Sequence, residues 1–160
     1  MFNILIKLLL TFNQVGYFLH LTDIHYDPYY TEGTPVNCLR EKPGLKCCKK
    51  FSIPIKPFKK ANKWGDKKCD TSFLFINKSF DWIKSNINNI DFILYTGDSV
   101  GHNDISQSIK TNINSINKIN GLLKFYFNDI KIYYSIGNHD TYPVDQTQHN
   151  INNIFLNNFA

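Results

Sequence analysis

The stretch Tyr17-Phe18-Leu19-His20-Leu21-Thr22-Asp23-Ile24-His25 joins a strand-like apolar run to two side chains that can bind metal. Two further runs, residues 90–96 and 131–136, lead into Gly97-Asp98 and Gly137-Asn138-His139-Asp140. All three runs are short, rich in β-branched and aromatic residues, and bounded by Gly, Asp or Asn, which is typical of buried strands in an α/β sheet. The candidate ligands therefore follow the ends of three predicted strands.

Two segments between these runs carry apolar residues at helical spacing and predict helices at about 73–87 and 105–127. Asp70, Thr71 and Ser72 are available to cap the first. The predicted order is strand, long loop, helix, strand, helix, strand. This order requires crossover connections and parallel strands, so the carboxyl ends of the strands meet at one edge, where α/β proteins collect their ligands.

The residue types at these strand ends suit two metal ions. Two divalent cations about 3.5–4 Å apart repel each other, so an anionic oxygen must bridge them, and Asp98 is the candidate bridge. Asp23 and His25 are two residues apart, so in extended chain they point to the same side and can share one ion. Asn138 offers a neutral oxygen to the second ion.

The third motif also supplies candidate catalytic residues. His139 would face the substrate as an acid or as a charge stabiliser. Asp140 follows it, either as the partner that orients the imidazole or as a turn-forming residue.

The pattern D-x-H, then G-D, then G-N-H-D resembles the calcineurin-like metallophosphoesterases. Longer strings resemble the acid sphingomyelinase-like phosphodiesterases within that group, and their order covers most of residues 17–147. The strings are FLHLTDIHYDPYY (18–30), WGDKKCD (64–70), LYTGDSVGHND (94–104) and SIGNHDTYPVDQ (135–146).

The resemblance implies a metal-dependent hydrolase of phosphoric esters with two divalent ions, zinc in this subfamily. It implies the same roles for Asp23, His25, Asp98 and Asn138, and it places His102 beside His139 at the phosphate. Endopolyphosphatases share the D-x-H-x-D start and a histidine at the position of His102. The implied substrate is therefore a phosphodiester or a polyphosphate, either a small molecule or a lipid.

In fold, the resemblance implies the N-terminal half of a β-sandwich flanked by helices. The family's remaining metal ligands are histidines of the C-terminal half, including a G-H-x-H pattern that does not occur before Ala160. Residues 17–160 are therefore expected to form an incomplete phosphoesterase domain.

The connection at residues 28–70 is rich in lysine and contains all four cysteines, Cys38, Cys47, Cys48 and Cys69. An even cysteine count in a proline-interrupted loop favours disulfides and an oxidising compartment, and three pairings are open. Zinc binding by thiolates is the rival interpretation, but the adjacent cysteines lack C-x-x-C spacing. The family resemblance implies that Cys69 pairs with an upstream cysteine.

The net charge of +5 does not indicate a nucleic-acid partner, because the lysines are concentrated in this loop, which we expect to be solvated. Residues 1–16 include an apolar run interrupted by Lys7, which predicts a signal peptide and is too short for a membrane anchor. With the cysteines, it predicts a secreted or lysosomal protein. The sequon Asn77-Lys78-Ser79 is compatible with glycosylation on that route.

Three functional hypotheses follow. The first is a phosphodiesterase with a dinuclear metal site. The second is a truncated, non-catalytic remnant that binds metal or a partner through the retained half-site. The third is a cysteine-rich extracellular binding module in which the loop binds and the sheet is scaffold.

Overall fold

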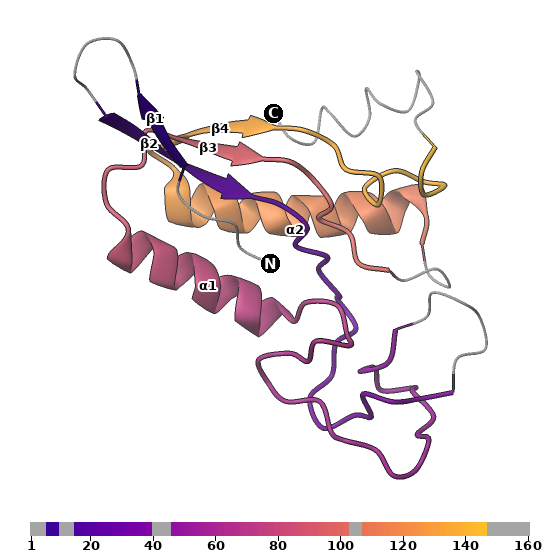
Figure 1. Ribbon diagram of the computed structural model, residues 1–160. Helices are drawn as coiled ribbons and strands as arrows, with labels where there is room; N and C mark the ends of the chain where they lie inside the picture. The colour runs from indigo at the N-terminus through magenta and orange to yellow at the C-terminus, as the bar shows by residue number, and fades with distance from the viewer. Residues whose placement is uncertain (1–5, 10–14, 40–45, 103–106, 147–160) are drawn as a thin grey trace.

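The computed structural model describes residues 6–9, 15–39, 46–102 and 107–146. Its sheet has the order β1-β2-β3-β4, in which β1 pairs antiparallel with β2 and the other neighbours are parallel (Figure 1). The strands are β1 (Ile6–Leu9), β2 (Val15–Leu21), β3 (Phe92–Tyr95) and β4 (Lys131–Tyr134). The predicted α/β fold with three parallel strands is confirmed, whereas β1 was not predicted and lies within the proposed signal peptide.

Helix α1 (Phe73–Asn86) and helix α2 (Ile109–Phe127) connect the parallel strands. Ser72 caps α1 by accepting a hydrogen bond from the backbone N of Phe75 at 3.3 Å. Ser108 caps α2 in a reciprocal pair with Thr111. The predicted start of the second helix, near residue 105, lies outside the described residues.

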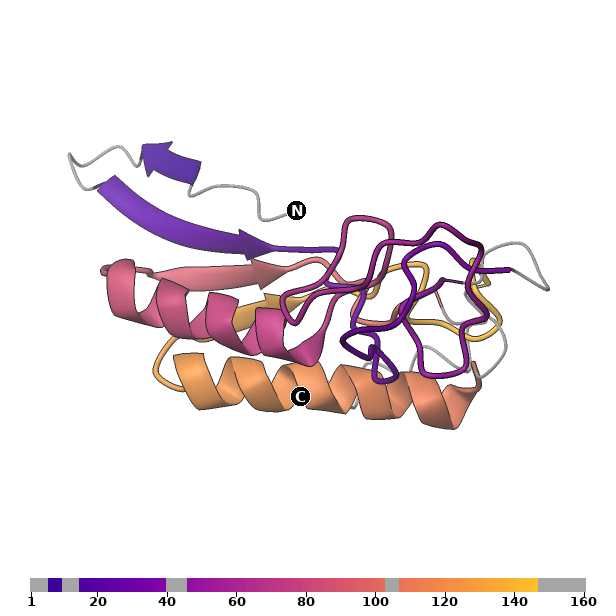
Figure 2. The ribbon, with the colours of Figure 1, turned by 90° about the horizontal axis from the view of Figure 1, so that it is seen from below.

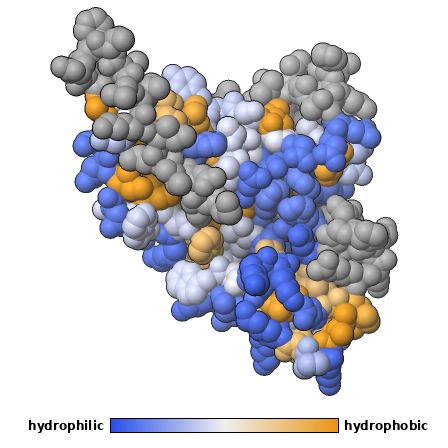
Figure 3. Space-filling model, viewed as in Figure 1, coloured by the Kyte–Doolittle hydropathy of each residue, from blue (hydrophilic) through white to orange (hydrophobic). Residues whose placement is uncertain are grey.

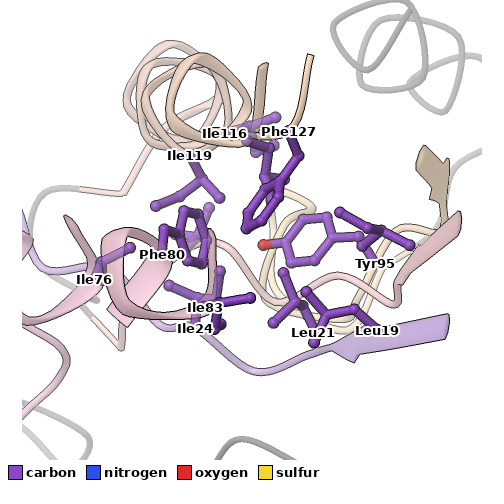
Figure 4. Close-up of a cluster of buried hydrophobic side chains, with 13 residues drawn as sticks. Leu19, Leu21, Ile24, Ile76, Phe80, Ile83, Tyr95, Ile116, Ile119 and Phe127 are labelled. Atoms are coloured by element: carbon purple, nitrogen blue, oxygen red, sulfur yellow. The ribbon is translucent and has the colours of Figure 1, made fainter. Parts of the chain in front are cut away.

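Both helices pack on the same face of the sheet (Figure 2). Their apolar stripes meet the inward side chains of β2 and β3, and Tyr95 reaches into the centre of this layer (Figure 4). Burial of each large apolar side chain contributes about 1.5–3 kcal/mol, so this layer holds the strand ends in a fixed relation. Its fully buried members include Leu21, Ile76, Phe80, Ile93, Ile116, Ile119, Leu123 and Phe127.

The opposite face of the sheet carries an aromatic row. The ring centroids of Phe18 and Phe92 are 5.1 Å apart in a stacked pair, and Phe92 meets Tyr133 edge-on at 5.8 Å. Tyr133 remains 54% exposed, and neither described helix covers this side. An apolar second face is expected of one half of a β-sandwich.

The loop at residues 28–70 is closed by the disulfides Cys38–Cys47 and Cys48–Cys69, so the implied pairing of Cys69 with an upstream cysteine is confirmed. The side chain of Lys49 forms a buried ion pair with Asp27. These links hold the described parts of the loop, residues 28–39 and 46–70, in which no regular strand or helix forms.

Two other features bear on cellular location. Neither described helix is long and apolar enough to cross a lipid bilayer. The sequon residue Asn77 lies within α1, where its Oδ1 accepts a hydrogen bond from Tyr126 Oη at 3.0 Å. A glycan on Asn77 Nδ2 would therefore stand next to this contact between the two helices.

Candidate metal centre

The loops after β2 and β3 continue side by side beyond the sheet. The backbone N of Asp23 donates to Gly97 O at 3.1 Å, and that of His25 donates to Asp98 O at 2.9 Å. Hydrogen bonds of this kind extend the pairing of the two strands past their ends. As a result, the candidate ligands of both loops are held at one edge of the sheet (Figure 1).

Three candidate ligands have left-handed backbone conformations. The φ angles are 52° at Asp23, 45° at His25 and 55° at Asp98. Such angles are uncommon outside glycine and cost on the order of 1–3 kcal/mol each, and they cluster at functional sites where the surrounding structure holds them. Here they turn the side chains away from the strand direction and toward one another.

Two glycines allow the second and third loops to approach closely. A Cβ on Gly97, whose φ is 91°, would overlap the backbone of Gly137. A Cβ on Gly137 would overlap both the carboxylate and the backbone N of Asp98. Both motifs therefore need glycine before the candidate ligand.

Asp23, His25 and Asp98 form a group whose candidate ligand atoms all lie within 4.8 Å of one another. His25 Nε2 is 3.7 Å from Asp23 Oδ1 and 3.8 Å from Asp98 Oδ2. Donors that share a tetrahedral zinc ion stand roughly 3.4 Å apart, because each lies about 2.0–2.2 Å from the ion. The group fits one divalent ion after small movements.

His25 is oriented for binding through Nε2. Its Nδ1 lies 2.9 Å from the carbonyl oxygen of Val100, which can only accept a hydrogen bond. Nδ1 therefore carries the proton, and the lone pair of Nε2 points toward the two carboxylates. A hydrogen bond of this kind fixes the tautomer and ring orientation of metal-binding histidines.

His102 is held by Asp70, for which the sequence indicated only a helix-capping role. Asp70 Oδ1 lies 2.8 Å from His102 Nδ1, and Asp70 Oδ2 accepts from the backbone N of His102 at 2.7 Å. Burial opposes ionisation of Asp70, but the hydrogen bond and charge of His102 outweigh it and lower its pKa. The available signal was its position at the end of the string WGDKKCD.

The three histidines His25, His102 and His139 form a second group of candidate ligands. The ring of His102 is 4.3 Å from each of the others, and the rings of His25 and His139 are 5.1 Å apart. Desolvation, and then the charges of His102 and His25, lower the pKa of His139. The neutral imidazole that results can accept a proton or bind a metal.

Of the two roles left open for Asp140, orienting the imidazole of His139 is not the one that the structure shows. Its carboxylate is buried and accepts hydrogen bonds from four backbone N–H groups, those of Gly137, Asp98, Ser99 and Val100, at 2.7–3.2 Å. His139 Nδ1 is buried and has no hydrogen-bond partner among the described residues. Asp140 therefore fastens the third loop to the second, where it positions the backbone of Asp98.

Asn138 is exposed and precedes Asp140, whose four backbone hydrogen bonds we call the clamp, by two residues. Its Nδ2 donates to Asp145 Oδ1 at 2.7 Å, which leaves its Oδ1 available for an ion. The next residue, His139, donates its backbone N to Asp98 Oδ1 at 2.9 Å. The structure thus brings together the three strand-end motifs and His102.

Comparison with known proteins agrees with this arrangement. The calcineurin-like phosphoesterase family model matches residues 16–159. The chain is 40% identical to a sphingomyelinase phosphodiesterase C of Dictyostelium discoideum over 133 residues, which are 82% of this chain and 28% of that protein. It is 34% identical to the mouse acid sphingomyelinase-like phosphodiesterase 3b over 145 residues, which are 89% of this chain and 29% of that protein.

A third relative extends the range of named activities. The chain is 34% identical to an endopolyphosphatase of Cryptococcus neoformans over 155 residues, covering 80% of this chain and 23% of that protein. The chain thus spans less than a third of the length of each of these relatives. Since the family model covers nearly the whole sequence and the motif residues converge at one edge of the sheet, the chain belongs to the calcineurin-like phosphoesterase family.

Proposed function

We propose that this chain provides most of the dinuclear metal site of a phosphodiesterase. The observation that carries the proposal is the convergence of Asp23, His25 and Asp98 beyond two strand ends, with the three-histidine group beside them. Carboxylate, imidazole and amide donors are the set that zinc accepts, so the residues fit the metal that the family implies. When bound, two such ions would polarise the phosphoryl group and lower the pKa of a water molecule.

Some residues of this chain would hold the metal ions, and others would contact the substrate. Asp23 and His25 would hold one ion, Asp98 would serve both, and Asn138 would offer its amide oxygen to the second. Asp140 would act only through the backbone, where its carboxylate accepts hydrogen bonds from the N–H of Asp98 at 2.8 Å and that of Ser99 at 2.7 Å.

His102 and His139 contact the phosphoryl oxygens. Asp70 keeps the proton of His102 on Nδ1, so Nε2 is the atom that faces the substrate. His139 has its Nδ1 buried and a pKa lowered by desolvation, so its neutral imidazole suits charge stabilisation by a hydrogen bond to a phosphoryl oxygen.

The substrate is proposed to be a phosphodiester of the sphingomyelin type. Relatives named for sphingomyelin and for polyphosphate align with about four fifths of this chain, and both substrate classes present similar anionic oxygens. A secreted or lysosomal location is supported by the two disulfides, which persist in oxidising compartments. N-terminal sequencing of the exported protein tests the proposed signal peptide, because cleavage near residue 16 would remove β1.

Zinc titration of three variants tests the metal assignment. Asp98→Asn should weaken binding of both ions, whereas the exposed Asp81→Asn on α1 should leave it unchanged. His139→Ala should keep zinc affinity and lower turnover of a phosphodiester substrate. If Asp98→Asn binds zinc normally, the metal site is wrong and the cysteine-rich module becomes the better hypothesis. Metal binding without turnover would favour the non-catalytic remnant.

A further inference from the structure

The positive charge of this protein is concentrated in one loop. Residues 28–70 contain eleven of the 18 Lys and Arg residues and four of the 13 Asp and Glu residues, for a net charge of +7. The remaining residues together carry −2. A loop with this much excess charge beside an acidic remainder attracts an anionic partner to itself in particular.

The same loop exposes large apolar side chains. Leu39, Phe51, Ile53 and Ile55 are 58%, 64%, 52% and 48% exposed, and we call them the loop surface. The backbone N of Leu39 donates to Ile53 O at 2.9 Å, in an antiparallel pairing next to Cys38 and Pro54. In antiparallel pairing, two residues directly opposite each other share a face, and so do alternate residues along one segment. Leu39, Ile53 and Ile55 therefore project to one side.

Exposed lysines flank the loop surface in sequence. Lys50 precedes Phe51, Lys56 follows Ile55, and Lys60 lies four residues further on. Figure 3 shows apolar side chains gathered at the outer end of the molecule, at the lower right, beside strongly hydrophilic ones. Apolar side chains flanked by exposed lysines can use both attractions that a negatively charged lipid surface offers.

We propose that the loop surface docks onto anionic lipid membranes. The apolar side chains would enter the headgroup and acyl boundary, while the lysines would remain at the level of the lipid phosphates. A nucleic acid would match the charge, but three of the four apolar side chains are aliphatic and offer no ring on which a base could stack. The membrane is therefore the partner that uses both properties of the loop.

The loop is rigidly connected to the candidate metal centre. Lys49 forms the buried ion pair with Asp27, two residues after His25, and the disulfide partner Cys69 directly precedes Asp70. Docking would therefore anchor the metal centre to the membrane through the loop. Membrane binding does not depend on the proposed chemistry, and its test measures no turnover.

Vesicle flotation tests the proposal. The probes are phosphatidylcholine vesicles with and without phosphatidylserine, at low and at high salt. The protein should float with the anionic vesicles, and salt should weaken this binding. Phe51→Ser combined with Ile53→Ser should lower partitioning roughly tenfold, because apolar area no longer enters the membrane. Lys50→Glu combined with Lys56→Glu should lower it by about fivefold per lysine or more, the equivalent of about 1 kcal/mol each.

The matched controls lie on the helices. Trp82→Ser combined with Phe125→Ser removes side chains that are 60% and 75% exposed, and Lys84→Glu reverses an exposed charge on α1. These variants should bind vesicles like the parent protein. Equal losses in the control and loop variants, binding that ignores phosphatidylserine, or no binding at all would overturn the proposal. If the protein binds no vesicles, a protein partner becomes the better hypothesis for the loop surface. Circular dichroism confirms that each variant is folded.

Discussion

The strand-end edge and the disulfide loop lie next to each other, but they are held together by different means. At the edge, backbone hydrogen bonds continue the sheet, and the buried carboxylate of Asp140 gathers four N–H groups. In the loop, two disulfides and the Lys49–Asp27 ion pair surround only a small cluster of Val36, Cys48 and Ala61. The edge is positioned by the fold, and the loop by cross-links.

The two regions need different precision, because one would bind metal ions and the other would form a docking surface. Ligands of a metal pair must be placed within fractions of an ångström, which hydrogen bonds anchored in a packed sheet achieve. A docking surface needs only to remain folded and exposed, which cross-links ensure without a large core. The two regions meet at Asp70, which follows Cys69 in the loop and holds His102 at the edge.

The largest effect should follow loss of the clamp at the edge. Asp140→Ala leaves four N–H groups without their acceptor in a buried place, and we expect the free energy of unfolding to fall by on the order of 4 kcal/mol. Zinc affinity should fall as well, because Asp98 loses its fixed backbone. Urea denaturation and zinc titration measure the two effects. Asp140→Asn, which keeps one acceptor oxygen, should be intermediate, and a stable Asp140→Ala variant would contradict the role of the clamp.

Removal of the disulfides should affect the loop and spare the metal. Cys48→Ser with Cys69→Ser opens a loop of 21 residues and should cost about 3 kcal/mol, whereas Cys38→Ser with Cys47→Ser opens one of 9 and should cost about 2.5 kcal/mol. Denaturation measures both. Zinc affinity of either variant should match the parent protein, because no ligand is held by a disulfide. A parallel loss of zinc binding would show that the two regions are not independent.

Asp70→Asn tests the residue at which the disulfide loop meets the strand-end edge. The amide cannot fix the proton of His102 on Nδ1 as a carboxylate does, so turnover should fall roughly ten- to hundredfold while zinc affinity stays unchanged. Steady-state kinetics on a phosphodiester substrate, with Asp81→Asn as a surface control, measure this. Unchanged kinetics would remove Asp70 from the site.

The same variant should change the dependence of stability on acid. The pKa of Asp70 is lowered in the folded protein, because the hydrogen bond and charge of His102 outweigh the effect of burial. Its contribution to stability is therefore present above the pKa of the unfolded chain and is lost as the pH falls through the folded pKa. Asp70→Asn should lack this loss, and denaturation midpoints across the acid range would show a flatter curve.

The edge could be predicted from sequence because its determinants are local and periodic. The runs ending at Thr22, Thr96 and Ile136 predicted strand ends within two residues of the observed ones, and parallel order then brought their motifs together. The sequence left the role of Asp140 open and did not indicate its backbone partners, because acceptance of distant backbone N–H groups leaves no trace in spacing. Asp70 was missed as the partner of His102 for a related reason, since 32 residues separate the two.

The loop was less predictable, because cross-links between distant residues do not follow any period. The resemblance implied a partner for Cys69, but neither composition nor spacing selected Cys48 over its neighbour. Strand β1 was missed because Ile6–Leu9 reads as an apolar leader, and only pairing with β2 reveals it as an edge strand. Tertiary context decides such short apolar segments.

The smallest predicted effect provides a control for the comparison. Gly121 lies inside α2, where an added Cβ would meet no atom within 4 Å, so Gly121→Ala should stabilise the protein by about 0.5–1 kcal/mol. Because the site is distant from both regions, its effect should add to theirs in thermal denaturation. Combined with Asp140→Ala, it should recover part of the stability but none of the zinc affinity, since it does not restore the backbone of Asp98. Recovery of zinc binding along with stability would mean that the clamp acts only by keeping the domain folded, and the contrast between edge and loop would then be one of stability alone.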